Sequence, residues 1–283
     1  MRTRLIAALA VAALLLTGCV QEVKPVKLET LQDFQTQKIK WRTCYDSFKC
    51  ADVLVPIDYT NIKLGTFKIS VLKYEASNKE DRIGSMFVNP GGPGASGVDY
   101  AYQAEYILSP QVLALYDIVG FDPRGVGRSA PIRCLTDDET DANYASDSKP
   151  DNAQEFETLV KEAQDYVAKC EKNTKNLTAY STENTARDMD VIRAVLGDEK
   201  LNYLGKSYGT YLGTIYAQLF PDKVGRLVLD GAIDPGATPL QQSLIQAVGF
   251  DNALDAFIKD CLQLETCPLP KDATKQYFTD LFD

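Results

Sequence analysis

The sequence predicts an α/β protein whose mostly parallel sheet carries helices on both faces. Three observations indicate this fold class. Apolar runs of strand length alternate with segments of helical period between residues 44 and 264. The 283 residues, 45% of them hydrophobic, are enough for one sizeable core. A short apolar run at 201–204 enters Gly-x-Ser-x-Gly at 205–209, and a helical pattern follows at once.

Residues 1–18 predict the signal peptide of a lipoprotein. Arg2 and Arg4 make its start positive, and the apolar run at 5–16 is too short to span a bilayer as a lone anchor. Leu-Thr-Gly-Cys at 16–19 resembles the bacterial lipobox, in which a peptidase cuts before the cysteine. The resemblance implies a lipid on Cys19 that anchors the chain to the membrane, on the extracytoplasmic side of a bacterial cell envelope. We expect residues 19–43 to be the lipidated N-terminus and a tether, because 21–37 lacks a clear period.

Six further cysteines form an even set in a compartment that permits disulfides. Cys44 with Cys50 and Cys261 with Cys267 can each close a short loop, which leaves Cys134 with Cys170. A metal site is the alternative interpretation. It is disfavoured, since the chain has no histidine and no paired Cys-x-x-Cys, so we predict no metal.

The elements expected along the core follow from periodicity and turn residues. Two strands with alternating apolar residues are expected to pair antiparallel across a turn at 61–65. The predicted strands lie at 51–58, 66–74, 85–89, 116–121, 201–204 and 224–230. The predicted helices lie at 98–109, 153–170, 182–196, 208–220 and 240–264. Residues 137–149 are expected to be a polar loop.

The strand, Gly-x-Ser-x-Gly and helix in succession are what a nucleophile elbow requires. Gly205 and Gly209 lack Cβ, so the chain can reverse sharply at Ser207. The hydroxyl of Ser207 then projects above the sheet, and the next helix points its positive end at the site. The alternative is a glycine-rich turn that only packs a helix on a strand.

A second glycine-rich loop, Asn-Pro-Gly-Gly-Pro-Gly at 89–94, also follows a strand. Such a loop lets backbone N–H groups approach a ligand closely. We assign the oxyanion donors of an acyl-transfer reaction to the N–H groups of Gly92 and Tyr208. A phosphate-binding loop is a poor alternative, because no Lys-Ser/Thr pair follows. A plain turn is the other alternative.

The loop at 89–94, the stretch Asp-Pro-Arg-Gly-Val-Gly-Arg-Ser at 122–129 and the elbow at 205–209 resemble, in order and spacing, the α/β-hydrolase family of prolyl iminopeptidases. They are most similar to its secreted branch, the bacterial tripeptidyl aminopeptidases. The resemblance covers 44–264, the expected α/β-hydrolase core. It implies a serine exopeptidase that needs no cofactor and releases short units, such as tripeptides, from peptide N-termini through an acyl-enzyme on Ser207. An esterase on the same fold is the alternative.

The sequence departs from that family because it contains no histidine. Family members continue through a helical cap, a strand bearing an acid and a final strand with the catalytic histidine. We therefore expect the C-terminal strands and most of the cap to be absent, with 265–283 the start of a truncated cap or insertion. The chain is interpreted as an N-terminal fragment, inactive alone, whose partner would be a C-terminal half that supplies Asp and His. A non-catalytic lipid-anchored remnant or binding protein is the second class of function.

Three charged residues near these motifs invite other roles. Lys206 could serve as a base for Ser207, but at an elbow its side chain should point away from the hydroxyl. Asp230 follows the next strand, whereas the acid in this fold is expected later. Arg124 is interpreted as structural rather than as a binder of substrate carboxylate. The formal net charge of −9 argues against nucleic acid as a partner, so the expected partners are a peptide substrate and the membrane.

Overall fold

The computed structural model describes residues 28–282, so the predicted signal peptide, Cys19 and the first part of the tether lie outside the described residues. Within this part, seven strands form one sheet in the order β1-β2-β3-β5-β4-β6-β7. The strands are β1 (Arg42–Cys44), β2 (Phe48–Pro56), β3 (Thr66–Tyr74), β4 (Gly84–Asn89), β5 (Tyr116–Phe121), β6 (Leu201–Lys206) and β7 (Val224–Asp230).

The sheet has a parallel half and an antiparallel half. Strands β4, β5, β6 and β7 are parallel to one another. Strands β1, β2 and β3 pair antiparallel in chain order. The antiparallel pair predicted for 51–58 and 66–74 is β2 and β3. Strand β3 also joins β5 antiparallel. Because the carboxyl ends of parallel strands meet at one edge, the loops after β4, β5 and β6 lie together there. The predicted α/β class is confirmed.

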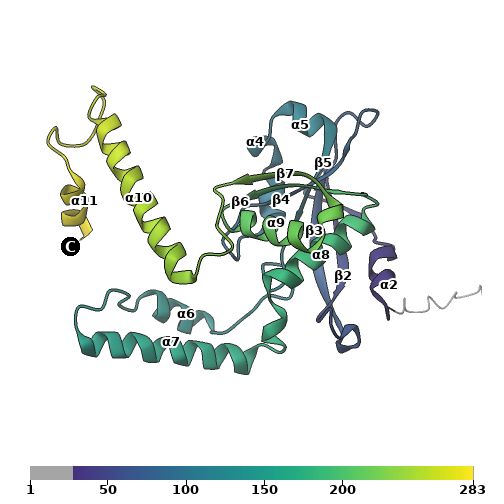
Figure 1. The fold of residues 1–283 in the computed structure, drawn as a ribbon, viewed down its shortest axis with the longest axis horizontal. Coiled ribbons are helices and arrows are strands. Elements are labelled where there is room, and N and C mark those ends of the chain that lie inside the picture. The colour runs from purple at the N-terminus through teal and green to yellow at the C-terminus, as the bar shows by residue number, and fades with distance from the viewer. Residues whose placement is uncertain (1–27, 283) are drawn as a thin grey trace, which may run out of the picture.

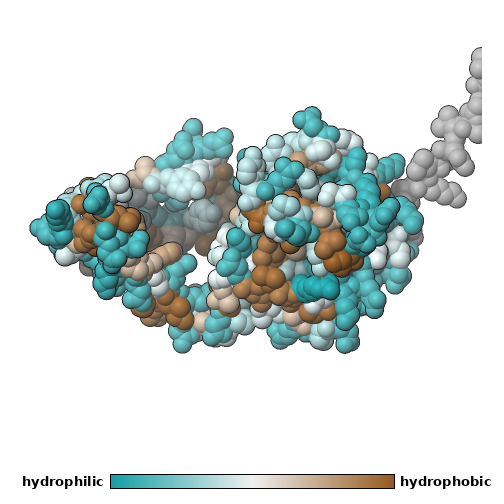
Figure 2. Space-filling model, turned by 90° about the horizontal axis from the view of Figure 1, so that it is seen from above, coloured by the Kyte–Doolittle hydropathy of each residue, from teal (hydrophilic) through white to brown (hydrophobic). Residues whose placement is uncertain are grey.

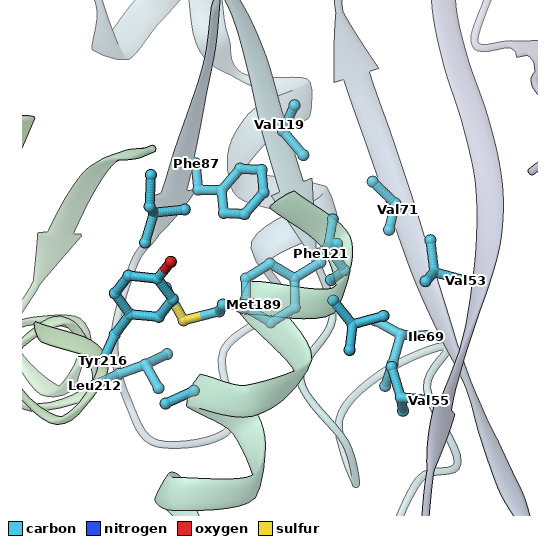
Figure 3. Packing of buried hydrophobic residues seen from close by; sticks show 14 of the residues in the cluster. Val53, Val55, Ile69, Val71, Phe87, Val119, Phe121, Met189, Leu212 and Tyr216 are labelled. Atoms are coloured by element: carbon cyan, nitrogen blue, oxygen red, sulfur yellow. The ribbon is translucent and has the colours of Figure 1, made fainter. Parts of the chain in front are cut away.

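Helices cover both faces of the sheet (Figure 1). On one face, α8 (Thr182–Val195) and α9 (Tyr208–Leu219) enclose a core in which Phe87, Phe121 and Met189 lie together (Figure 3). The other face is covered by α3 (Gly97–Tyr102), α4 (Ala104–Ile107) and α5 (Pro110–Leu115). A second apolar core lies on that face and includes Val88, whereas Phe87 lies in the first core, because successive side chains of a strand point to opposite faces. Residues 98–109 were predicted as one helix, and the chain instead breaks it at Gln103.

Two helical arms extend from the same end of the sheet (Figure 1). The first, here the α6–α7 arm, joins β5 to α8 through α6 (Asp137–Tyr144) and α7 (Ala153–Asn173). The second consists of α10 (Pro239–Cys261) and α11 (Lys275–Phe282). The prediction of a loop at 137–149 is wrong in its first part. The Thr136–Glu139 capping box starts α6, but this helix buries no residue and so leaves no apolar period.

The tether predicted at 19–43 needs correction from residue 28 onward. There α2 (Leu31–Thr36) begins with a capping box between Thr30 and Asp33 and buries Phe34 completely in the core. The Gln37 side-chain amide then hydrogen-bonds both the N–H and the C=O of Leu54, at 2.9 and 2.8 Å. A helix this short shows no periodicity in the sequence. The buried Phe34 ring and the Gln37 side-chain amide hold this segment against the core.

The three predicted disulfides are confirmed. Cys44–Cys50 joins β1 to β2, Cys134–Cys170 ties the two ends of the α6–α7 arm, and Cys261–Cys267 follows α10. Three single-turn 3₁₀ helices complete the chain at Ile62–Leu64, Leu177–Ala179 and Pro221–Lys223.

Much apolar surface is left open, both on the arms and on the body that holds the sheet (Figure 2). Helix α10 exposes several large apolar side chains, and Val228 of β7 is 56% exposed. Those on α10 are Leu240, Leu244, Ile245, Val248, Phe250 and Phe257. Even so, no helix within 28–282 is long and apolar enough to cross a membrane.

Candidate active site

Ser207 occupies a strained turn between β6 and α9. Its backbone has φ 53° and ψ −123°, a conformation that costs a non-glycine residue about 1–3 kcal/mol. The Ser207 N–H donates to the Asp230 carbonyl at 2.9 Å, and the Thr210 hydroxyl donates to the Ser207 carbonyl at 2.7 Å. A Cβ on Gly205 would collide with the Gly209 carbonyl oxygen. The elbow predicted from the sequence is therefore the conformation that the chain adopts.

Tyr203 supports the elbow from below. Its ring is buried, and its hydroxyl donates to the Gly209 carbonyl at 2.7 Å. Burial raises the pKa of Tyr203, so the phenol stays a neutral donor at physiological pH. A Cβ on Gly213 would lie 2.8 Å from the Tyr203 ring, which shows how closely α9 packs on β6.

The glycine-rich loop after β4 lies directly against the elbow. Gly91 has φ +99°, and a Cβ there would lie 2.5 Å from the Lys206 carbonyl oxygen, 2.9 Å from the Ser207 Cβ and 3.0 Å from the Tyr208 nitrogen. Its own N–H donates to the Asn89 side chain at 2.9 Å. Gly91 was not among the predicted site residues, although two adjacent glycines after a strand could have indicated the close approach.

The two predicted oxyanion donors remain available in this arrangement. Within residues 28–282, neither the Gly92 N–H nor the Tyr208 N–H has a hydrogen-bond acceptor. Tyr208 is the first residue of α9, where backbone N–H groups lack intrahelical partners. Its phenol lies within 2.8 Å of the Thr182 hydroxyl, which ties the elbow to the start of α8. The Tyr208 N–H, which directly follows Ser207 in the chain, is therefore a free donor at the elbow.

Lys206 and Asp230 form an ion pair with each other. The Lys206 ammonium lies 3.7 Å from the Asp230 carboxylate. The Tyr100 phenol and then Asp230 raise the pKa of Lys206, so this amine stays protonated at neutral pH. A protonated amine cannot accept a proton, which argues against Lys206 as a base for Ser207.

Arg124 is sealed inside the protein, as its structural interpretation required. Two of its N–H groups bind both carboxylate oxygens of Asp188, at 2.8 and 2.6 Å. The other three donate to the carbonyl groups of Pro56, Ile57 and Ala179. Both side chains of the ion pair are fully buried. With all five donors used, Arg124 has none left for a substrate.

Asp122 organises the remainder of the 122–129 stretch. Its buried carboxylate accepts hydrogen bonds from the Ser96 hydroxyl and from the N–H groups of Val98 and Arg128, the last two at 3.2 and 2.9 Å. The Arg128 guanidinium also pairs with Asp99 at 2.8 Å. This part of the family-like pattern therefore holds the loops around the elbow in place.

A cleft of about 860 Å³ opens beside the elbow, within the range of small-ligand sites. Ser207 does not line it, but Tyr208 and Gly91, which flank Ser207, do. The loops after β4 and β5 form one wall, and the α6–α7 arm forms the other. No group of three or more His, Cys, Asp or Glu side chains within 28–282 is placed to hold a metal ion.

Comparison with known proteins agrees with this architecture. The sequence model of the family described as alpha/beta hydrolase fold matches residues 84–282. The chain belongs to this family. Three relatives resemble this α/β hydrolase at similar levels of identity. They are serine protease Hip1 of Mycobacterium tuberculosis, 37% identical over 281 residues, tripeptidyl aminopeptidase of Streptomyces lividans, 38% over 229 residues, and carboxylesterase B of M. tuberculosis, 38% over 233 residues.

The matches cover far more of this α/β hydrolase than of its relatives. They span 95%, 75% and 80% of the chain but 54%, 42% and 44% of Hip1, the aminopeptidase and the carboxylesterase, respectively. The chain thus spans about half the length of the curated relatives it matches. The matched part includes the elbow and the glycine-rich loop, while the sequence itself contains no histidine.

Proposed function

We propose that Ser207 is the nucleophile of a serine exopeptidase-type hydrolase that releases short units from the N-termini of peptides. The observation that carries this proposal is the strained Ser207 with Gly91 packed against it and the free N–H of Tyr208 next to it in the chain. Strain of this kind persists where the surroundings impose it, and it clusters at functional sites. The peptidase names of two relatives support the same reaction class.

In the proposed reaction, the Ser207 hydroxyl attacks the carbonyl carbon of the scissile bond. The N–H groups of Gly92 and Tyr208 stabilise the oxyanion that forms, each contributing about 3–4 kcal/mol if they resemble measured donors. The tetrahedral intermediate then collapses: its C–N bond breaks, the peptide amine leaves with the proton that the base took from Ser207, and the acyl-enzyme remains. Water hydrolyses this ester and regenerates the Ser207 hydroxyl. A base must accept the serine proton, because a neutral hydroxyl is a weak nucleophile.

The base is the missing part of this site. The sequence contains no histidine, Lys206 is held protonated, and Asp230 pairs with Lys206. We propose that a further polypeptide segment, corresponding to the second half of the relatives, supplies Asp and His. Loss of the base in a serine protease of another fold costs about 10⁶ in turnover, so these 283 residues alone should show almost no hydrolysis.

A fluorophosphonate probe tests the assignment of Ser207. The chain alone should react slowly, and addition of the C-terminal half of a relative such as the Hip1 serine protease should increase labelling. Ser207→Ala should abolish labelling in both samples, whereas Ser96→Ala, in the neighbouring loop, should not. Robust Ser207-dependent hydrolysis by the chain alone would contradict the proposal and require another base.

An esterase is the second candidate, because carboxylesterase B is as similar to the chain as the peptidases are. Both reactions use the same nucleophile and the same oxyanion donors, so the elbow does not separate them. Once the C-terminal half of a relative has been added to restore turnover, comparison of kcat/KM for a tripeptide anilide and for an acyl ester of similar size separates the two reactions. Preference for the anilide supports the peptidase, and preference for the ester supports the esterase.

We also propose that the mature chain begins at Cys19 and is anchored by lipid to the outer side of a bacterial cytoplasmic membrane or to another envelope membrane. The order of charge, apolar run and lipobox supports this, and three disulfides suit an oxidising compartment. Labelled palmitate should enter the wild type and not Cys19→Ser. Equal labelling of both would contradict the proposal.

A further inference from the structure

The cleft beside Ser207 has a wall that is separate from the sheet. The α6–α7 arm contributes Asp137, Thr140, Asn143, Tyr144 and Tyr166 to it. The facing wall consists of the loops that carry the elbow and Gly91. Any substrate that fills this cleft beside Ser207 must therefore touch the arm.

The root of the arm is closed by contacts between its own two ends. The Cys134–Cys170 disulfide closes it, and the Asn173 side chain donates to the Cys134 carbonyl at 2.9 Å. Lys169 pairs with Glu139 at 3.0 Å across the two helices. These contacts hold the two ends of the arm together at the cleft, which Asp137 lines.

Three charged side chains line the cleft within the described residues, and they are not equivalent. Arg124 is neutralised by Asp188 and has no free donor. Asp137 and Arg133 have no ion-pair or hydrogen-bond partner within 28–282. Asp137 is the single carboxylate of the cleft.

The α6 helix does not need Asp137 to begin. The Thr136 hydroxyl and the Glu139 carboxylate already form a complete capping box. The Thr136 backbone N–H, with Lys169, lowers the pKa of Glu139 to about 2, which keeps that carboxylate ionised for the cap. Asp138, in the same turn, offers the same favourable charge to the helix dipole but does not line the cleft.

We propose that Asp137 binds the α-ammonium group of a peptide and so selects substrates with a free N-terminus. This inference rests on the proposed peptidase function and adds the group that would recognise the substrate. An α-amino group has a pKa of about 7.7–8.0, so it is mostly cationic at pH 7 and pairs with a carboxylate. The rings of Tyr144 and Tyr166 in the same cleft offer faces that also attract a cation.

This placement gives the arm a role in setting the length of the released unit. The N-terminus would be held at the root of the arm while the scissile carbonyl lies at Ser207. The number of residues between these two points would then be fixed by the distance from Asp137 to the elbow.

Binding to the purified chain tests the inference without requiring turnover. Calorimetry would compare trialanine amide with its N-acetyl form, which lacks the charge, against wild type, Asp137→Asn, Asp137→Glu and Asp138→Asn. We expect wild type, Asp137→Glu and Asp138→Asn to prefer the free amine. Asp137→Asn should bind it about fivefold to tenfold more weakly, between the effect of an exposed pair and that of a charge-assisted hydrogen bond. The preference should fade above about pH 8, as the ammonium loses its proton.

Several results would overturn the inference. One is that wild type fails to bind the peptide, or that it binds the free and acetylated peptides equally. Another is that Asp137→Asn and Asp138→Asn lose affinity for the free amine equally, or that only Arg133→Gln loses it. Circular dichroism of each variant checks that α6 is retained. Failure of Ser207 labelling together with Asp137-dependent binding would reject the proposed chemistry and leave the ammonium site standing, so the two proposals fail separately.

Discussion

Single residues fix the geometry around Ser207 through contacts that are distant in the sequence. Ser207 itself was predictable, because strand, Gly-x-Ser-x-Gly and helix are local features. The approach of Gly91 to the elbow was not, since it depends on β4 and β6 being neighbours in the sheet. The structural interpretation of Arg124 was correct, but the acceptors of its five hydrogen bonds lie in three separate segments that only the fold brings together.

Gly91 should be intolerant of a side chain for a reason specific to its neighbours. In Gly91→Ala the added Cβ would meet the Lys206 carbonyl oxygen at 2.5 Å, so the loop or the elbow must move. Gly94→Ala is a matched control, because Gly94 also has a positive φ but has no atom within 4 Å of the new Cβ. Both variants should lose about 1–2 kcal/mol from the backbone conformation. In urea titrations, Gly91→Ala should lose clearly more, and equal losses would refute the close packing.

The Arg124–Asp188 pair should be far more important for stability than the exposed pairs. Asp188→Asn leaves a buried guanidinium without its counter-charge, which costs about 3–5 kcal/mol. Asp251→Asn removes one of the two carboxylate partners of Lys275 at an exposed site and should cost less than about 1 kcal/mol. Chemical denaturation measures both. Similar losses of stability in the two variants would contradict the expected importance of the buried Arg124–Asp188 pair.

At the scale of elements, long apolar patterns were predicted well and short or polar ones were not. The six core strands and the helices α7, α8, α9 and α10 follow from runs that carry a clear period. Helix α6 buries no residue, and α2 has six residues, so neither leaves a hydrophobic signature. Their capping boxes, Thr136–Glu139 and Thr30–Asp33, were the signals that could have revealed them.

The Cys134–Cys170 disulfide should stabilise the α6–α7 arm more than a short-loop disulfide stabilises its hairpin. Its cysteines are 36 residues apart, against 6 for Cys44–Cys50. In the chain-entropy model the two bonds contribute about 4 and about 2 kcal/mol, respectively. Replacing each pair by serines and measuring unfolding and limited proteolysis tests this. Cleavage should increase within 135–176 only in the first variant, and an unchanged arm would contradict the expected role of the bond.

At the scale of the whole molecule, the sequence indicated the family and the order of the elements but not the position of the arms. The alternation of strands and helices predicts the sheet, because short connections and parallel pairing allow few arrangements. Where α6–α7 and α10–α11 lie depends on packing against the core, and few of their side chains are buried there. The wall that the α6–α7 arm adds to the cleft therefore could not be predicted from the sequence.

The exposed apolar surface of the second arm leads to a prediction for the molecule in solution. Ile245 and its apolar neighbours on α10 are open, and so is Val228 on β7, which pairs with β6 alone within 28–282. Large apolar patches and free strand edges favour association. The purified chain should therefore self-associate with rising concentration, as measured by light scattering.

Ile245→Glu and Val228→Lys should each reduce the apparent mass, because a charge on the patch must be desolvated when two copies meet. Leu64→Lys, at an exposed apolar residue outside the patch, should leave the apparent mass unchanged. A wild type that stays monomeric at high concentration would contradict this prediction.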